Sequence, residues 1–250
     1  MKNAIVTGVG RYLGIGAEIC RMLSSKGYGL FITSNKEYDS SCANINENDV
    51  DRLLQELKNT NTVFRDYNLG YEEDVVSLFD EANKELGTID VLISCMCYYV
   101  DDSLSDLSEE LLLLNSRVNI LGPTLLSREF IKRYKGDNGR IVLFSSTQEL
   151  EPSINQLSYV ITKASVPILV KNLSIYAAKK NITINALNPG LTDTGIIDIN
   201  TEKKYIQRNP FHRIGTVKDV TNLIEFLISP QSNWITGQTI NSEGGLYREV

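Results

Sequence analysis

The pattern that most constrains the fold of this chain is the alternation of short apolar runs with longer segments of helical periodicity. Runs of strand length lie at residues 4–7, 30–33, near Val63, 91–94, 141–144, 182–186 and 238–241. Between them, apolar residues recur at helical spacing over residues 15–25, 50–57, 72–85, 108–134, 158–178 and 218–227. Continuous apolar strands with helices between them are typical of a parallel sheet covered on both faces. We therefore predict an α/β fold built on a doubly wound parallel sheet.

The chain has 250 residues, a length that one large α/β unit can use. No repeat, low-complexity tract or linker divides it, so we predict a single domain over residues 1–250. One stretch, residues 190–216, carries no clear strand or helix pattern and is long for a loop in a compact domain. Loops of this length often cover binding sites, so we predict that residues 190–216 form a substrate lid.

The charge of the chain argues against several classes of partner. The formal net charge is -6 and the pI is about 5.0, and no segment supplies the basic face that nucleic-acid binding needs. No basic-then-apolar signal precedes the first motif, and no apolar run reaches about 18 residues, so we expect a cytoplasmic protein without a membrane segment. Cys20, Cys42, Cys95 and Cys97 lack CxxC spacing, so we expect reduced thiols and no metal site.

A glycine-rich segment follows the first predicted strand and leads directly into a helix. It reads Thr7-Gly8-Val9-Gly10-Arg11-Tyr12-Leu13-Gly14-Ile15-Gly16. Glycines let the backbone turn and approach a pyrophosphate, and the helix that begins near Gly14 offers free N–H groups to it. The alternative is an ordinary strand-to-helix turn. The position after the first strand favours a Rossmann-like dinucleotide-binding loop, with cofactor contacts from Gly8, Arg11, Gly14, Ile15 and Gly16.

The end of the second predicted strand bears on which dinucleotide binds. Folds that bind NAD carry an acidic residue there for the ribose hydroxyls, whereas this stretch reads Ile32-Thr33-Ser34-Asn35-Lys36 and has no carboxylate. Arg11 and Lys36 could reach a 2′-phosphate, although both could instead be solvated surface charges. We therefore expect NADP(H) to be favoured, with Ser34 among its contacts, while NAD(H) remains possible.

Two Tyr–Lys pairs have the spacing that places both side chains on one helix face. Tyr159 and Lys163 form one pair, and Tyr176 and Lys180 form the other. Because the two tyrosines point about 100° apart on a helix, both pairs cannot serve one site. Ser146 ends the fifth predicted strand, at the carboxyl edge where ligands bind in open α/β sheets, and this favours the first pair.

Several of these segments together resemble the classical short-chain dehydrogenase/reductase family. Thr7-Gly8 and Gly14-Ile15-Gly16 resemble its glycine motif, although the loop is two residues longer here. Ser146 precedes Tyr159 by the family's 13 residues, and Asn119 matches the family's helix asparagine. The resemblance implies a catalytic tetrad of Asn119, Ser146, Tyr159 and Lys163.

In such a tetrad the ammonium of Lys163 would lower the pKa of the Tyr159 phenol so that it can exchange a proton with substrate. Ser146 would hydrogen-bond the substrate oxygen. By resemblance, Lys163 also bonds the nicotinamide ribose, and Asn119 holds water in a proton relay.

The resemblance also assigns cofactor contacts along the rest of the chain. Asn68 and Leu69 occupy the family's position beside the adenine, and the segment after residue 188 matches the family's Pro-Gly segment. Ser94-Cys95-Met96-Cys97 departs from the family's Asn-Asn-Ala-Gly, although Ser94 can still form a hydrogen bond. The cofactor contacts implied are Asn68, Leu69, Ser94, Tyr159, Lys163, Pro189, Gly190, Thr192 and Thr194.

The expected function is therefore the reduction of a ketone or 3-oxoacyl carbonyl to an alcohol, or the reverse, by a homotetrameric enzyme resembling 3-oxoacyl-[acyl-carrier-protein] reductases. Two alternatives remain. An enoyl reductase of related fold would place its tyrosine and lysine seven residues apart, but residue 166 is a valine. A non-catalytic NADP(H)-binding sensor or scaffold would have no need of a proton donor at position 159.

Overall fold

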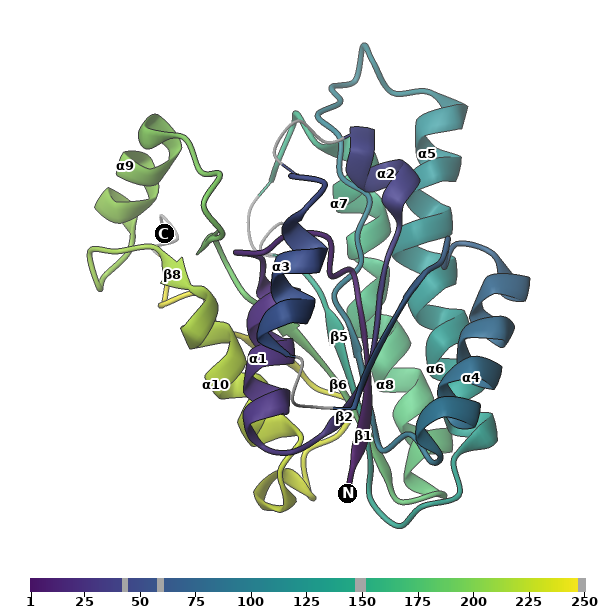
Figure 1. Ribbon diagram of the computed structural model, residues 1–250. Helices are drawn as coiled ribbons and strands as arrows, with labels where there is room; N and C mark the ends of the chain where they lie inside the picture. The colour runs from purple at the N-terminus through teal and green to yellow at the C-terminus, as the bar shows by residue number, and fades with distance from the viewer. Residues whose placement is uncertain (42–44, 58–60, 147–151, 247–250) are drawn as a thin grey trace.

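The computed structural model describes residues 1–41, 45–57, 61–146 and 152–246, and in these ranges the chain forms a central seven-stranded parallel sheet flanked by helices (Figure 1). The strand order is β3-β2-β1-β4-β5-β6-β9. Every neighbouring pair is parallel, which confirms the predicted doubly wound, Rossmann-like architecture. The strands are β1 (Asn3–Thr7), β2 (Gly29–Ser34), β3 (Thr62–Asp66), β4 (Val91–Ser94), β5 (Gly139–Phe144), β6 (Ile182–Asn188) and β9 (Thr239–Asn241).

The central strands are mostly apolar because the sheet has a hydrophobic core on each face. Side chains alternate between faces along a strand, so Ala4 and Val6 of β1 enter one core while Ile5 enters the other. Phe31 of β2 and Leu92 of β4 lie on the same side as Ile5. A strand buried on both faces needs a continuous apolar run, and this is why the strands were visible in the sequence.

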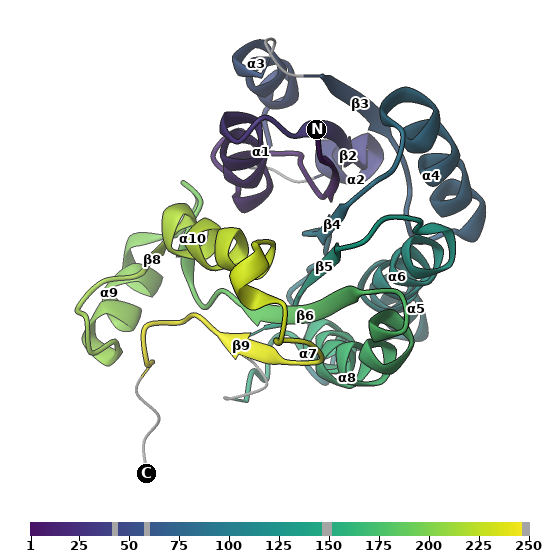
Figure 2. The same cartoon turned by 90° about the horizontal axis from the view of Figure 1, so that it is seen from below.

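Helices cover both faces, as the view along the sheet in Figure 2 shows. Helices α1 and α10 pack together on one face, and α4, α6 and α8 cover the other. The helices are α1 (Ile15–Ser25), α2 (Lys36–Ser41), α3 (Asp49–Glu56), α4 (Glu72–Leu86), α5 (Glu109–Ser116), α6 (Gly122–Arg133), α7 (Leu157–Lys163), α8 (Ser165–Ala178), α9 (Ile199–Arg208) and α10 (Val217–Leu227). No helix in the described ranges combines the length and the apolar character needed to cross a membrane.

Proline interrupts the two long helices expected at residues 108–134 and 158–178. A π-helical turn, η1 (Arg117–Leu121), separates α5 from α6, and the Gly122 N–H bonds the Arg117 carbonyl five residues back. Pro123 follows and has no N–H to continue the helical ladder. In the second segment, Ala164 separates α7 from α8, and Pro167 lies in the first turn of α8.

The prediction that residues 190–216 have no regular structure is wrong. They contain the helix α9 and two short paired strands, β7 (Thr192–Asp193) and β8 (Gly215–Thr216). Asp198 caps α9 by accepting hydrogen bonds from the N–H groups of Asn200 and Thr201. The sequence signal is weak because α9 buries none of its residues fully, so it lacks the apolar stripe of a core helix.

Candidate active site

A cleft of about 940 Å³ lies along the carboxyl edge of the sheet. Its floor is formed where strands end: Gly8 follows β1, Ser34 ends β2, Cys95 follows β4, Phe144 ends β5 and Pro189 follows β6. The strand order reverses between β1 and β4, and ligands of doubly wound sheets bind at this switch point.

The structure brings most of the predicted site residues to this cleft. Eleven of them line it: Gly8, Arg11, Gly14, Ile15, Gly16, Ser34, Asn68, Leu69, Tyr159, Lys163 and Pro189. Six others lie outside the lining: Ser94, Asn119, Ser146, Gly190, Thr192 and Thr194. Ser94 is buried within β4, and the residues that follow it reach the cleft instead.

The glycine loop has the close contacts that a dinucleotide loop requires. Gly8 has a φ of +74°, and a Cβ there would lie 2.6 Å from the backbone nitrogen of Met96. A Cβ on Gly16 would lie 3.0 Å from the Gly8 carbonyl oxygen, so α1 can pack tightly against the loop only with glycine at this position. Despite its two additional residues, the loop therefore lies close against the end of β4 and against the start of α1.

The first turn of α1 faces the same cleft. Its N-cap is Gly14, which has no side chain to bond the N–H groups of the first turn. Gly14, Ile15 and Gly16 all line the cleft, so these donors and the positive end of the helix dipole are available to a phosphate.

At the end of β2 the cleft contains both a cation and a carboxylate. Arg11 lines the cleft, and its buried Nη1 has no hydrogen-bond partner among the described residues. Lys36 does not line the cleft, and its Nζ lies 5.7 Å from the centre of the Phe64 ring. Asp39 of α2 was not predicted here, because the carboxylate was sought only within residues 32–36.

Tyr159 lies beside Ser146 and Lys163 at the other end of the cleft. The Tyr159 hydroxyl shares a hydrogen bond with the Ser146 side chain. Lys163 is only 4% exposed, and its Nζ donates a hydrogen bond of 2.5 Å to the Phe144 carbonyl oxygen at the end of β5. Burial raises the pKa of Tyr159 above its ordinary value, and the bond to Ser146 only partly opposes this. The phenol therefore holds its proton at neutral pH in this state.

The second Tyr–Lys pair has no access to the cleft. Tyr176 is 62% exposed on the outer side of α8, and the Lys180 Nζ donates to the Lys132 carbonyl oxygen. Of the two pairs with equal spacing, only Tyr159 and Lys163 line the cleft.

Asn119 is buried beneath the cleft and joins three segments. Its Oδ1 accepts a hydrogen bond from the Tyr98 N–H (2.8 Å), while its Nδ2 donates to the Tyr98 carbonyl (2.9 Å) and to the Thr162 hydroxyl (3.0 Å). The π-helical turn that contains Asn119 is thereby fixed both to the chain after β4 and to α7. In this state Asn119 positions the helix that carries Tyr159.

A second buried asparagine reinforces this arrangement. Asn115 donates to the Ser158 hydroxyl (2.9 Å), and its Oδ1 accepts from Asn119 Nδ2 (3.2 Å). The carboxylate of Asp102 accepts the backbone N–H of Ser158 at the start of α7. The sequence carried a clue to neither residue, because each acts through contacts with α7, which lies far along the chain.

The segment after β4 forms one wall beside Tyr159. The Tyr99 ring meets the Tyr159 ring edge-on, with 5.3 Å between centroids, and its hydroxyl donates to Asp101. Gln156 also donates to the Tyr99 hydroxyl. Cys97 lines the cleft next to Tyr159, in place of the glycine expected from the family motif. The Tyr99 ring and Cys97 therefore border the cleft beside the Tyr159 phenol.

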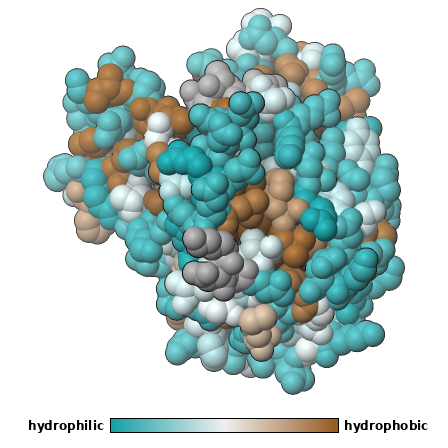
Figure 3. Space-filling view, viewed as in Figure 1, coloured by the Kyte–Doolittle hydropathy of each residue, from teal (hydrophilic) through white to brown (hydrophobic). Residues whose placement is uncertain are grey.

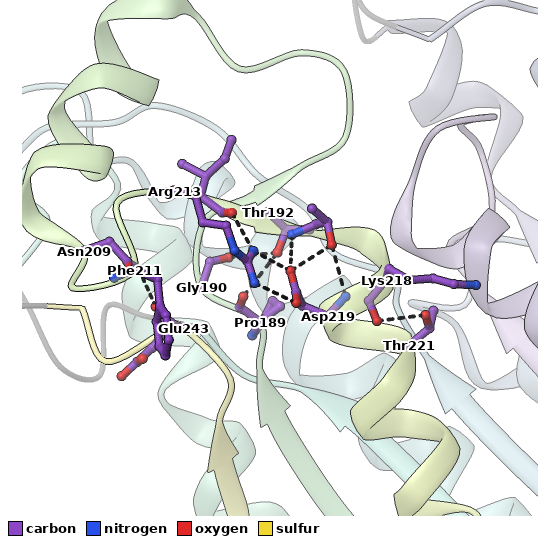
Figure 4. Close-up of polar contacts among 12 residues, drawn as sticks. Pro189, Gly190, Thr192, Asn209, Phe211, Arg213, Lys218, Asp219, Thr221 and Glu243 are labelled. Carbon is purple, nitrogen blue, oxygen red and sulfur yellow. Dashed lines mark hydrogen bonds and ion pairs between the residues drawn. The ribbon is translucent and has the colours of Figure 1, made fainter.

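The segment after β6 is held by the polar contacts drawn in Figure 4. Gly190 has a φ of +63°, and a Cβ there would lie 2.6 Å from Glu243 Cβ. The Thr192 hydroxyl donates to the Pro189 carbonyl (3.1 Å), so it points back into its own turn. Arg213 forms a two-pronged ion pair with Asp219 at the start of α10. These contacts anchor both ends of the segment that carries α9.

Between these anchors, the α9 segment exposes apolar side chains. Ile196, Ile199 and Phe211 are 46%, 58% and 72% exposed, and Figure 3 shows hydrophobic surface over α9. Ile196 also lines the cleft. The segment that carries α9 therefore presents exposed apolar side chains, and one of them, Ile196, borders the cleft.

Comparisons with known proteins agree with this geometry. A family model described as Enoyl-(Acyl carrier protein) reductase matches residues 8–247. The uncharacterized oxidoreductase YjdA of Bacillus subtilis (strain 168) is 32% identical over 250 residues, covering 99% of this chain and 97% of the relative. The 3-oxoacyl-[acyl-carrier-protein] reductase FabG of Rickettsia felis is 31% identical, covering 98% of this chain and 96% of the relative.

A solved structure shares the fold. The short-chain dehydrogenase/reductase from Serratia marcescens BCRC 10948 aligns with a TM-score of 0.86 and 22% sequence identity, over 98% of this chain and 97% of that chain. Together with the sheet order, the glycine loop and the matches along almost the whole sequence, this shows that the chain belongs to the short-chain dehydrogenase/reductase family of NAD(P)-dependent oxidoreductases.

Proposed function

We propose that the protein reduces a ketone or 3-oxoacyl carbonyl to an alcohol, or catalyses the reverse reaction, with NADP(H) favoured and Tyr159 as the general acid/base. The observation that carries the proposal is that Tyr159, bonded to Ser146, and Lys163 line the same cleft as the glycine loop. Cofactor and proton donor would therefore meet at one substrate position.

The chemistry divides between the dinucleotide and the side chains. A bound nicotinamide would supply or accept the hydride. Tyr159 holds its proton at neutral pH and donates it to the alkoxide oxygen during reduction. Ser146, as a hydroxyl donor beside that phenol, stabilises the developing negative charge on the same oxygen. The buried ammonium of Lys163 favours the phenolate that remains once the proton has left.

The preference for NADP(H) is supported by Arg11. Its Nη1 is buried at the end of β2 and has no hydrogen-bond partner in the described part of the chain, so a 2′-phosphate would satisfy it. A buried guanidinium donor without a partner costs free energy, and binding a phosphate would recover it.

The substrate class is proposed from the relatives and from the catalytic spacing. The relative from Rickettsia felis is named as a 3-oxoacyl-[acyl-carrier-protein] reductase. Tyr159 and Lys163, four residues apart, both reach the cleft, and this favours carbonyl over enoyl reduction. The alternative, a cofactor-binding sensor without catalysis, is less favoured because a phenol bonded to a serine at the cleft has no use in binding alone.

A substrate panel tests the proposal. Purified protein with NADPH is mixed with ketones, 3-oxoacyl thioesters and enoyl thioesters, and the loss of nicotinamide absorbance is followed. We expect turnover with at least one carbonyl substrate and none with the enoyl thioesters. Tight cofactor binding without turnover on any carbonyl would favour the sensor instead.

Cys97 offers a probe of cofactor binding that does not depend on turnover. Cys97 is exposed in the cleft, whereas Cys20 is buried and Cys95 is only partly exposed, and desolvation raises the pKa of both of these thiols. We expect iodoacetamide to alkylate Cys97 ahead of both, and NADPH at ten times its Kd to slow that reaction about tenfold by occupying the cleft. The measurement is the labelling rate of the Cys97 peptide by mass spectrometry, with Cys42, which lies outside the described residues, followed on its own peptide. Equal Cys97 rates with and without NADPH would place the cofactor elsewhere.

We also propose that the protein is a homotetramer, as its family resemblance implies. Two separate apolar surfaces support this. Ile161, Ile168 and Ile175 recur every seven residues along α7 and α8 and are 54%, 63% and 64% exposed. Trp234, 98% exposed, lies between α10 and the edge strand β9. A tetramer of twofold symmetry needs two different interfaces, and exposed apolar stripes and open sheet edges are the surfaces such interfaces cover.

Substitution of the first surface tests the assembly. We expect Ile168→Asp to lower the molar mass measured by light scattering from that of a tetramer to that of a dimer or monomer, because a charge at the centre of an apolar interface is costly to bury. Leu104→Asp is the matched control, since Leu104 is 82% exposed on the loop after β4. If both variants keep the wild-type mass, the α7–α8 surface is not an interface.

A cytoplasmic location is the last part of the proposal. Cys20, Cys95 and Cys97 are free thiols, as expected of a protein in a reducing compartment.

A further inference from the structure

A carboxylate that the sequence pattern did not anticipate lines the cleft near the glycine loop and the end of β2. Asp39 lies on α2, which directly follows β2, and it is half-buried. Its side chain packs against the Cα of Gly10, where a Cβ would collide with the carboxylate. The Ser34 side chain lies close enough to the same carboxylate to lower its pKa. Asp39 therefore spans the gap between the glycine loop and the end of β2.

The charges around Asp39 come from three segments. Arg11 of the glycine loop is a cation that stabilises the ionised carboxylate. Asp66, at the end of β3, opposes ionisation as a like charge. On α2 itself, Lys36 is directed over the Phe64 ring and Glu37 is an exposed residue of the cleft rim. The carboxylate of Asp39 and the guanidinium of Arg11 are thus the opposed charges at this end of the cleft.

The Asp39 carboxylate and the Arg11 guanidinium would have opposite effects on the binding of the adenine ribose of NAD(H) and NADP(H). A carboxylate accepts hydrogen bonds from the 2′- and 3′-hydroxyls of NAD(H) and repels a 2′-phosphate. A guanidinium binds the phosphate with charge-assisted hydrogen bonds. Because Lys36 points away, no second lysine or arginine side chain among the described cleft residues at the end of β2 reinforces Arg11.

We propose that Asp39 is a specificity-determining residue for the cofactor, opposing Arg11 so that the protein binds NADH as well as NADPH. The inference rests on the proposed dinucleotide site. It places the choice of cofactor on an acidic residue five positions beyond the strand end, brought back to the ribose by α2. Removing the Asp39 charge should leave Arg11 unopposed and make the protein strongly selective for NADPH.

Equilibrium binding without substrate tests this directly. Kd values for NADPH and NADH are measured by nicotinamide fluorescence at about pH 8. We expect Asp39→Asn to tighten NADPH about tenfold and to change NADH by less than about threefold, and Arg11→Gln to weaken NADPH about tenfold. Glu37→Gln is the matched control, because it removes a carboxylate from the same helix and the same cleft, and it should alter either Kd by less than about twofold.

The pH dependence provides a second readout. Burial raises the pKa of Asp39 to about 6, with the nearby Asp66 acting in the same direction. Wild-type Asp39 is therefore ionised at pH 8 and mostly protonated at pH 5, where it resembles asparagine. The tenfold NADPH gain of Asp39→Asn should shrink towards unity by about pH 5. Comparing variant with wild type at each pH cancels the part of the pH dependence that titration of the 2′-phosphate gives to both proteins alike.

The possible outcomes distinguish a failure of the Asp39 proposal from a failure of the proposed function. An unchanged NADPH Kd in Asp39→Asn, or an equal gain in Glu37→Gln, overturns the role of Asp39 and leaves the proposed function standing. Wild-type protein that binds neither NADPH nor NADH overturns the proposed function, and this inference with it. Circular dichroism and thermal melting confirm that each variant is folded before its Kd is interpreted.

Discussion

Tyr159→Phe is expected to lower kcat for carbonyl reduction by about 10³-fold, the scale of a lost general acid. The substitution removes only the hydroxyl that bonds Ser146 and keeps the ring that packs edge-on against Tyr99. The cleft and the glycine loop stay intact, so the NADPH Kd should change by less than about threefold. Steady-state kinetics together with cofactor fluorescence measure both quantities on the same preparation.

Tyr176→Phe is the matched control. It removes the hydroxyl of the other tyrosine that precedes a lysine by four residues, but this side chain is exposed on α8. We expect wild-type kcat in that variant. Near-normal turnover in Tyr159→Phe would contradict the mechanism, while a large loss in both variants would mean that structural damage, rather than a missing proton donor, explains the result.

The environment of Tyr159 also predicts how the rates of carbonyl reduction and of alcohol oxidation depend on pH. Burial raises the pKa of the phenol, so Tyr159 is in the protonated form that reduction requires at neutral pH, and reduction should not need alkaline conditions. Alcohol oxidation requires the phenolate as base, so its rate should rise with pH through the alkaline range.

The fold was readable from the sequence because its strands are buried on both faces. The runs around Ile5, Phe31 and Leu92 are apolar at every position, since alternate side chains enter opposite cores. The helix α1 was also predicted with its observed bounds, because six of its eleven residues are buried in one stripe. In both cases the local pattern is a direct consequence of burial.

The helices that the sequence pattern did not predict, α2 and α9, are not marked by the burial of an apolar face. The short helix α2 and the helix α9 bury little, so no apolar stripe marks them. Asp39 reaches the glycine loop only because α2 turns the chain back towards Gly10, a contact that the strand-end pattern does not encode. The π-helical turn that contains Asn119 lies where Pro123 cannot continue the helical hydrogen bonds, whereas periodicity alone predicted one continuous helix.

Within the site, residues set by a local motif were placed better than those assigned by position in the family pattern. The glycine loop and the Tyr159–Lys163 pair line the cleft, because a strand-to-helix turn and a helix face determine where they point. Thr192 was placed by its position after Pro189, but its hydroxyl bonds that residue's carbonyl. Asn119 likewise does not line the cleft, because its side-chain amide forms hydrogen bonds with the backbone N–H and carbonyl of Tyr98.

Gly8→Ala is expected to have the largest effect on stability of any single methyl group added to the loop. The new side chain would adopt a φ of +74°, which costs about 1–2 kcal/mol for a residue with a Cβ. That Cβ would also lie 2.6–2.8 Å from backbone atoms of Cys95 and Met96, so the end of β4 must shift, at a further cost of roughly 1–3 kcal/mol. We expect a fall in Tm of about 6–15 °C and a loss of NADPH binding.

Gly27→Ala separates the two contributions. Gly27 has nearly the same conformation, with a φ of +76°, but nothing lies within 4 Å of a Cβ there. Its substitution should therefore cost only the backbone term, a fall in Tm of about 2–6 °C, and leave NADPH binding intact. If thermal melting gives equal losses for the two variants, the positive φ alone explains the glycine at position 8. A larger loss in Gly8→Ala, together with lost cofactor binding, would mean that the loop must lie against the end of β4 for the cleft to hold a dinucleotide.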